Sequence, residues 1–264
     1  MRGGDGIVAH NINILGDFLG KRDVEELTRE ALHEKYGFSQ ADVMVLFGGS
    51  ILCGGDVLAA AMKENVAKKY IIVGGAGHTT PTFRKRVQKE IPALKTEGLS
   101  EAEIFDAYLK YKYSLSVDFL ETESTNCGNN ITYLLDLIER EQIACNSIIL
   151  SQDATMQYRM AATLMKYRPD ITIINYATYQ ASVKEKDEKR IYETDILGMW
   201  DMNHYITLLL GEIPRLTDDE NGYGPKGKGY IAHIDIPDEI TDAFQALLEQ
   251  YQVREANPEF ASKR

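Results

Sequence analysis

Short apolar runs alternate along this chain with longer amphipathic segments, and each run ends in or precedes a glycine, hydroxyl or carboxylate residue. This alternation is typical of repeated βα units, in which helices cover both faces of a parallel sheet. Runs that are apolar on both faces suit strands buried in this way. Five strands are predicted: Asp42–Gly48, Tyr70–Gly75, Ser116–Leu120, Ser147–Ser151 and Ile171–Asn175.

The segments between these strands carry Leu, Ile, Ala or Met at three-and-four spacing, which predicts helices that cover the sheet. They are Asp56–Lys68, Ser100–Lys112, Asn129–Glu141 and Thr155–Tyr167. No composition break divides the 264 residues, so one domain is expected, with an N-terminal helix at about 10–35 and a helical and loop extension at about 187–264. Within that extension, helices are predicted at Asp187–Gly211 and Asp238–Val253.

Composition limits the compartment and the partners. The formal net charge of -11 disfavours nucleic acid and anionic lipid surfaces as partners. The three cysteines are widely spaced and form no CxxC pair, which argues against disulfides and a zinc site. No signal-peptide core is visible, and no apolar run approaches the roughly 20 residues of a membrane-spanning helix. We expect a cytoplasmic protein without a metal, whose partner is a small molecule; its oligomeric state stays open.

Two glycine-rich turns directly follow the first two predicted strands: FGGSILCGGD and VGGAGHTT. Glycine lets backbone amides approach a ligand, and the start of the following helix favours an anion. A single such turn can simply reverse the chain, but two in series favour a binding site. Neither turn matches a dinucleotide fingerprint or a phosphate-binding P-loop. The predicted ligand-binding residues here are Gly48, Gly49, Ser50, Gly74, Gly75, Gly77 and His78.

Polar residues also follow the third and fourth predicted strands, in ETESTNCGNN and SQDATMQYR. Their carboxylates, hydroxyls and amides suit a ribose, an amino-acid group or a sugar, although Ser124 and Asn126 can instead cap the next helix. The basic run Arg84–Arg86 is interpreted as a solvated helix face. The candidate ligand-binding residues are Ser124, Asn126, Gln152, Asp153 and Arg159, and the candidate acid or base residues are His78, Glu121 and Asp153.

In their order along the chain, these motifs resemble the YdcF-like family, which belongs to a broader group that includes the SanA and ElyC envelope proteins. The resemblance spans most of the chain. It also includes the segment from Ser100 to Glu103 and the long stretch LLLGEIPRLTDDENGYGPKGKGYIAHID. It implies a Rossmann-like α/β fold, S-adenosylmethionine as the ligand, and Glu103 as a further binding residue.

The sequence departs from the pattern of the broader group at two positions. Asn129 stands where a glutamate is common, and Met156 stands where some members have a histidine. Both changes remove acid or base groups, so the resemblance implies ligand binding more directly than catalysis. We therefore expect binding of S-adenosylmethionine or a related adenosine compound, with the ribose near Glu121 to Asn126.

Three alternatives stay open at this stage. The first is an enzyme that acts on a phosphorylated or glycolipid envelope precursor, with His78, Asp153 and Arg159 holding the anion and Glu121 moving a proton. The second is a methyltransferase-like activity, for which no base is predicted. The third is a regulatory protein that uses the bound ligand only as a signal. The sequence also leaves open whether the Gly222–Gly229 loop closes over a ligand.

Overall fold

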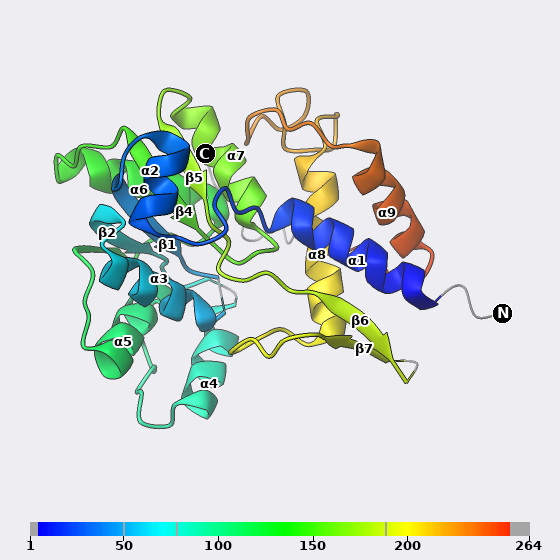
Figure 1. Cartoon of the computed structure of the whole chain (residues 1–264), viewed down its shortest axis with the longest axis horizontal. Coiled ribbons are helices and arrows are strands. Elements are labelled where there is room, and N and C mark those ends of the chain that lie inside the picture. Colours follow the sequence, from blue (N-terminus) through cyan, green and yellow to red (C-terminus); the bar gives the residue numbers. More distant parts are fainter. Residues whose placement is uncertain (1–4, 50, 78, 188, 254–264) are drawn as a thin grey trace.

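A five-stranded parallel sheet with the strand order β3-β2-β1-β4-β5 lies at the core of one half of the molecule (Figure 1). The computed structural model describes residues 5–49, 51–77, 79–187 and 189–253. The strands are β1 (Ala41–Phe47), β2 (Ala67–Val73), β3 (Phe119–Glu121), β4 (Ser147–Ser151) and β5 (Thr172–Asn175). The strand order reverses between β1 and β4, as in Rossmann-like sheets. The predicted fold class is confirmed.

Helices cover both faces of the sheet, because alternate residues of its strands are apolar on both sides. Met44 and Leu46 of β1 pack with one set of helices, and Val43 and Val45 pack with the other. Each fully buried side chain of this kind contributes about 1.5–3 kcal/mol. The first set is α2 (Arg29–Tyr36), α3 (Cys53–Glu64) and α5 (Glu101–Tyr113), and the second is α6 (Cys127–Arg140) and α7 (Gln157–Tyr167).

A second apolar core joins the two ends of the described chain beside α7 (Figure 1). It contains α1 (Asp5–Leu19), α8 (Met202–Leu216), α9 (Asp238–Leu248) and an antiparallel hairpin of β6 (Val183–Lys186) and β7 (Lys189–Tyr192). Asn13 of α1 clamps the hairpin through hydrogen bonds with both the N–H and the carbonyl of Val183. No helix in the described part of the chain is both long and apolar enough to cross a bilayer.

Two predicted helices do not form as expected. The first half of Asp187–Gly211 is wrong, because Asp187 has a φ of 51° and turns the chain into the hairpin. Helix α8 begins later, where the Asp201 carboxylate accepts a hydrogen bond from the N–H of His204. The expected helix at 10–35 is two helices, α1 and α2, because Arg22 between them forms a β-bridge with Tyr176.

Smaller differences concern element ends. The third strand lies at Phe119–Glu121 instead of Ser116–Leu120, because Asp118 is held beside β2 through hydrogen bonds with the backbone of Tyr70. Helix α9 stops at Leu248, five residues before the predicted end. A helix that the sequence did not delimit, α4 (Thr80–Glu90), follows the second glycine turn.

Candidate functional site

The turns that leave β1, β2 and β3 pack against one another at the carboxyl edge of the sheet. The N–H of Gly74 donates to the carbonyl of Glu121 (2.9 Å), and the N–H of Gly75 donates to the carbonyl of Ser124 (3.0 Å). A Cβ added at Gly48 would lie 3.1 Å from the Cα of Gly74. Glycine is therefore required here because backbone packs against backbone.

The remaining glycine amides of these turns also have partners within the protein. The N–H of Gly48 donates to a β2 carbonyl (2.6 Å), and that of Gly77 donates to Thr80 Oγ1 (2.8 Å). The backbone of Gly49 hydrogen-bonds to the carboxylate of Glu101. The glycines consequently do not form an open cradle for an anion in this structure. Ser50 and His78, predicted in the same turns, lie outside the described residues.

Glu101 is a buried acid at this edge that was not among the predicted site residues. Its Oε1 accepts a hydrogen bond from Thr80 Oγ1 (2.8 Å), and a Cβ at Gly48 would lie 2.5 Å from its Oε2. Burial raises the pKa of Glu101. The sequence indicates this role only when two distant segments are considered together. Glu101, the first residue of α5, fills the space that Gly48 leaves in the turn after β1.

Glu103, predicted to bind the ligand, instead closes the start of α5. Its carboxylate accepts a hydrogen bond from the N–H of Ser100 (2.7 Å), and Ser100 Oγ accepts one from the N–H of Glu103 (3.2 Å). This reciprocal pair is a capping box, which satisfies two backbone donors at a helix start. Its acceptor is used locally, so Glu103 is the natural control position for experiments on the site.

Glu121, at the end of β3, has one carboxylate oxygen with partners and one without. Its Oε1 accepts hydrogen bonds from the N–H groups of Glu123 (2.6 Å) and Ser124 (3.0 Å). Its Oε2 is buried and has no hydrogen-bond partner among the described residues, and the residue is only 7% exposed. A buried acceptor without a donor is costly, more so when it is charged. Glu121 is therefore the acid of this edge that has an unused acceptor.

Asn126 caps α6, which was the alternative interpretation of that residue. Its side-chain oxygen accepts a hydrogen bond from the N–H of Asn129 (3.0 Å), and its Nδ2 donates to Asn129 Oδ1 (2.6 Å). Met156, the other position that departs from the resembled pattern, lies with its sulfur 4.0 Å from that of Cys127. The turns after β3 and β4 thus meet through these two sulfur atoms.

Asp153, after β4, is a fully buried carboxylate, and both of its oxygens accept hydrogen bonds from other side chains. Its Oδ1 accepts hydrogen bonds from Thr155 Oγ1 (2.7 Å) and Tyr179 OH (2.8 Å), and its Oδ2 accepts one from Trp200 Nε1 (2.9 Å). Burial raises the pKa of Asp153. The adjacent Gln152 donates from Nε2 to the carbonyl of Gly48 (3.0 Å) and so joins β1 to β4. Both residues hold turns together at the point where the strand order reverses.

The guanidinium of Arg159 pairs with a carboxylate of the protein itself. It forms a two-point ion pair with Glu212 of α8, with N–O distances of 2.5 and 2.9 Å, and the two side chains are only 12% and 6% exposed. This two-point geometry uses the Nε and Nη2 donors of the guanidinium. The structure therefore gives no support to the expectation that Arg159 binds an anionic ligand group. The contact with α8 could not be predicted from the local sequence.

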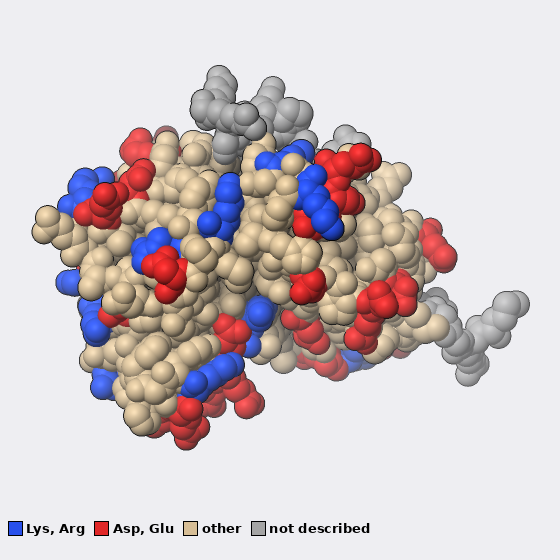
Figure 2. Space-filling view, turned by 90° about the horizontal axis from the view of Figure 1, so that it is seen from above, with Lys and Arg blue, Asp and Glu red and all other residues tan. Residues whose placement is uncertain are grey.

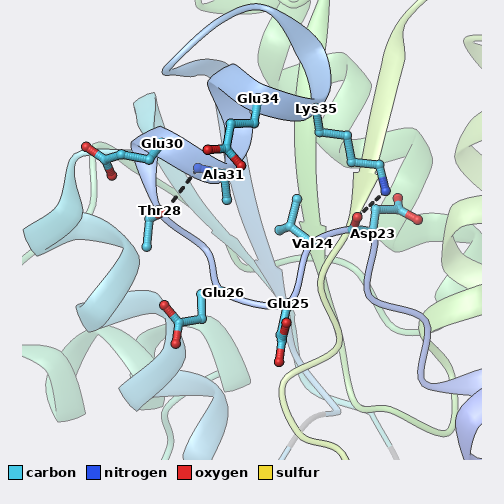
Figure 3. A pocket seen from close by; sticks show the side chains of 9 residues that line it. All are labelled: Asp23, Val24, Glu25, Glu26, Thr28, Glu30, Ala31, Glu34 and Lys35. Carbon is cyan, nitrogen blue, oxygen red and sulfur yellow. Dashed lines mark hydrogen bonds between the residues drawn. The ribbon is translucent and has the colours of Figure 1, made fainter.

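Two surface hollows lie away from this edge. One, of about 660 Å³, is lined by residues 23–35 around the start of α2, and Figure 3 shows its carboxylates spread around the hollow rather than gathered at one point. The other, of about 480 Å³, lies between α6 and the start of β4. In the described part of the chain, no three His, Cys, Asp or Glu side chains are grouped to hold a metal ion. We therefore take the buried acids near the strand ends, Glu101, Glu121 and Asp153, as the candidate site.

Charge on the surface agrees with the acidic composition. On the face shown in Figure 2, acidic and basic side chains are interspersed over the sheet half of the molecule, and acidic ones predominate over the half that contains α1 and α9. This face offers no broad basic surface to a polyanion. The chain matches no model of a known protein family, so its resemblance to the YdcF-like family stays a prediction.

Proposed function

We propose that this protein binds an adenosine-containing small molecule, with S-adenosylmethionine as the expected ligand, at the carboxyl edge of its sheet. The observation that carries the proposal is the buried Oε2 of Glu121, which lacks a donor among the described residues. A ribose hydroxyl is such a donor, and hydrogen bonds to an ionised acceptor are about twice as strong as neutral ones. Glu121 is therefore assigned to the ribose.

The balance of donors and acceptors supports this class of ligand. The partners of Glu121 are backbone amides, and they leave its Oε2 as an unused acceptor. The ligand expected here carries hydroxyl and amino groups, which can donate to such an acceptor. A phosphorylated envelope precursor has less support, because Arg159 is already paired with Glu212.

The position of the site within the sheet supports the same proposal. Open α/β sheets bind ligands beyond the carboxyl ends of their strands, at the point where the strand order reverses. Here that point lies between β1 and β4, and the hydrogen bond from Gln152 to Gly48 crosses it. The turns after β2 and β3 extend the same edge toward Glu121.

Calorimetric titration with S-adenosylmethionine and S-adenosylhomocysteine tests the proposal, with Glu121→Gln as the site variant. Glutamine cannot supply the charged acceptor, so we expect affinity to fall about tenfold or more. The matched control is Glu103→Gln, which should bind as the unchanged protein does, because glutamine also serves in a capping box.

Two results would contradict the proposal, one its ligand class and the other its assignment of Glu121. Absence of heat and of thermal stabilisation with both ligands, at concentrations where mass action would raise the melting temperature, rejects the ligand class. Unchanged affinity in Glu121→Gln, with normal binding by the parent protein, rejects the assignment of Glu121 to the ribose.

A further inference from the structure

The segment that follows β7, residues 193–201, lies across the edge of the sheet and is called the strap here. The carbonyl of Leu197 accepts a hydrogen bond from the N–H of Cys53 (3.3 Å), at the start of α3. The indole of Trp200 donates to Asp153 (2.9 Å). The strap thus contacts the elements that follow β1 and β4, which flank the reversal of strand order.

Arg86 of α4 lies against the strap with an unused donor. Its guanidinium carbon is 4.5 Å from the centroid of the Trp200 ring. Its Nη1 is buried and has no hydrogen-bond partner among the described residues. The prediction that Arg84–Arg86 is a solvated face is wrong for Arg86, and also for Arg84, which donates to the carbonyl of Leu99.

The guanidinium of Arg86 has donors to spare beside this contact. Its N–H groups project in the plane of the guanidinium, and Nη1 is one that the described residues do not use. These in-plane donors match the two oxygens of a carboxylate. A buried charged donor without an acceptor is unfavourable, so a carboxylate that reaches Nη1 would gain strongly.

Arg86 is linked through Trp200 to the β4 end of the edge, and Glu121 lies at its β3 end. Trp200 connects Arg86 to Asp153 after β4, whereas Glu121 ends β3. Three strand spacings separate β3 from β4 in the sheet, about 14 Å at ~4.8 Å per spacing. The two long side chains and a nucleoside with an amino-acid tail can together span this separation.

We propose that Arg86 binds the carboxylate of the amino-acid part of the ligand, with Trp200 of the strap stacked on its guanidinium. This inference rests on the proposed function and deepens it, because it states how the site distinguishes a nucleoside that carries an amino acid from one that does not. The acidic end of the edge selects hydroxyl donors, and Arg86 selects the carboxylate.

The test compares two probes that differ in the amino-acid part. S-adenosylhomocysteine carries the carboxylate, and 5′-methylthioadenosine is a related thioether nucleoside without it. In Arg86→Met, which keeps an apolar stem under Trp200, affinity for S-adenosylhomocysteine should fall about 10- to 100-fold, and affinity for 5′-methylthioadenosine should not change. The control is Lys85→Met, which removes the same charge from an exposed neighbour and should bind both probes normally.

Trp200 supplies an independent readout, since it is the single tryptophan of the chain. Saturation with S-adenosylhomocysteine should change its fluorescence emission in the parent protein, and the change should be absent in Arg86→Met. Equal losses for both probes in Arg86→Met, no loss for either, or unchanged emission at saturation would overturn the inference. Binding of neither probe to the parent protein would instead reject the proposed function itself.

Discussion

Gly75 shows at the scale of one residue how the edge depends on a missing side chain. A Cβ there would lie 2.3 Å from the carbonyl oxygen of Ser124 and 2.7 Å from that of Thr122. Both are backbone atoms, so no change of rotamer relieves the contact, and the turns after β2 and β3 would have to separate. The same close approach holds Glu121 in place through the turn that begins with it.

We therefore expect Gly75→Ala to lower the free energy of unfolding by about 1–3 kcal/mol, the usual cost of overpacking. Gly6→Ala is the matched control, because a Cβ at Gly6 in α1 meets nothing within 4 Å. It should not destabilise the protein, because alanine has the higher helix propensity. Urea denaturation of both variants measures the difference, and equal effects at the two positions would contradict this account.

At the scale of elements, the ion pair of Arg159 and Glu212 joins α7 of the sheet to α8 of the second core. Replacing Glu212 by glutamine leaves a buried guanidinium without its counter-charge, which costs about 3–5 kcal/mol in comparable sites. We expect a loss of that size in urea denaturation. The exposed pair of Arg140 and Glu141 is the control, since Glu141→Gln should change stability by less than about 1 kcal/mol.

A double replacement separates the charge effect from packing. Arg159→Met combined with Glu212→Leu removes both charges and keeps apolar volume, and such replacements of buried pairs are often neutral or stabilising. The double variant should therefore recover most of the stability that Glu212→Gln loses. A double variant that is as unstable as the single one would show that shape, not charge, holds α7 and α8 together.

At the scale of the whole molecule, the loop from α8 to α9 contacts α7 of the sheet half before the chain returns to the second core. The N–H of Ala232 donates to the carbonyl of Ala162 in α7 (3.0 Å), and His233 contacts Asp218 (2.7 Å) and Asp235 (2.9 Å). The hydrogen bonds of His233 to Asp235 and then to Asp218 raise its pKa above the ordinary value of 6.5. The loop is thus fastened in part by a titratable group.

The sign of the pH effect follows from the direction of this shift. A histidine whose pKa is raised by folding stabilises the fold fully below pH 6.5, and the contribution is lost as pH rises past the raised pKa. The urea midpoint of the parent protein should exceed that of His233→Gln at about pH 5.5, and the difference should vanish as pH rises past the raised pKa of His233. The difference should be small because His233 is half exposed. A difference independent of pH would contradict a titrating contact.

Local pattern sufficed for the central strands and for most of the helices on the sheet. The fourth strand, Ser147–Ser151, was predicted with its observed ends, because its residues are buried on both faces and no alternation confuses the period. The hairpin of β6 and β7 was missed, since its four-residue strands are mostly charged and their burial depends on α1. The strap was predicted as part of the helix Asp187–Gly211, because its contacts with Cys53 and Asp153 are also tertiary.

The sequence by itself determined the α/β class, the polar turns at the strand ends and the absence of long apolar spans in the described helices. These follow from periodicity and residue type over windows of ten or so residues. Only the tertiary structure decided which buried polar groups lack a hydrogen-bond partner among the described residues. Arg159 lies 53 positions from Glu212, and Trp200 lies 47 positions from Asp153, so the local sequence indicates neither contact. Burial of a charge is decided by the whole fold, and that is why Glu121 and Arg86, rather than the glycine amides, are left with unmet hydrogen bonds.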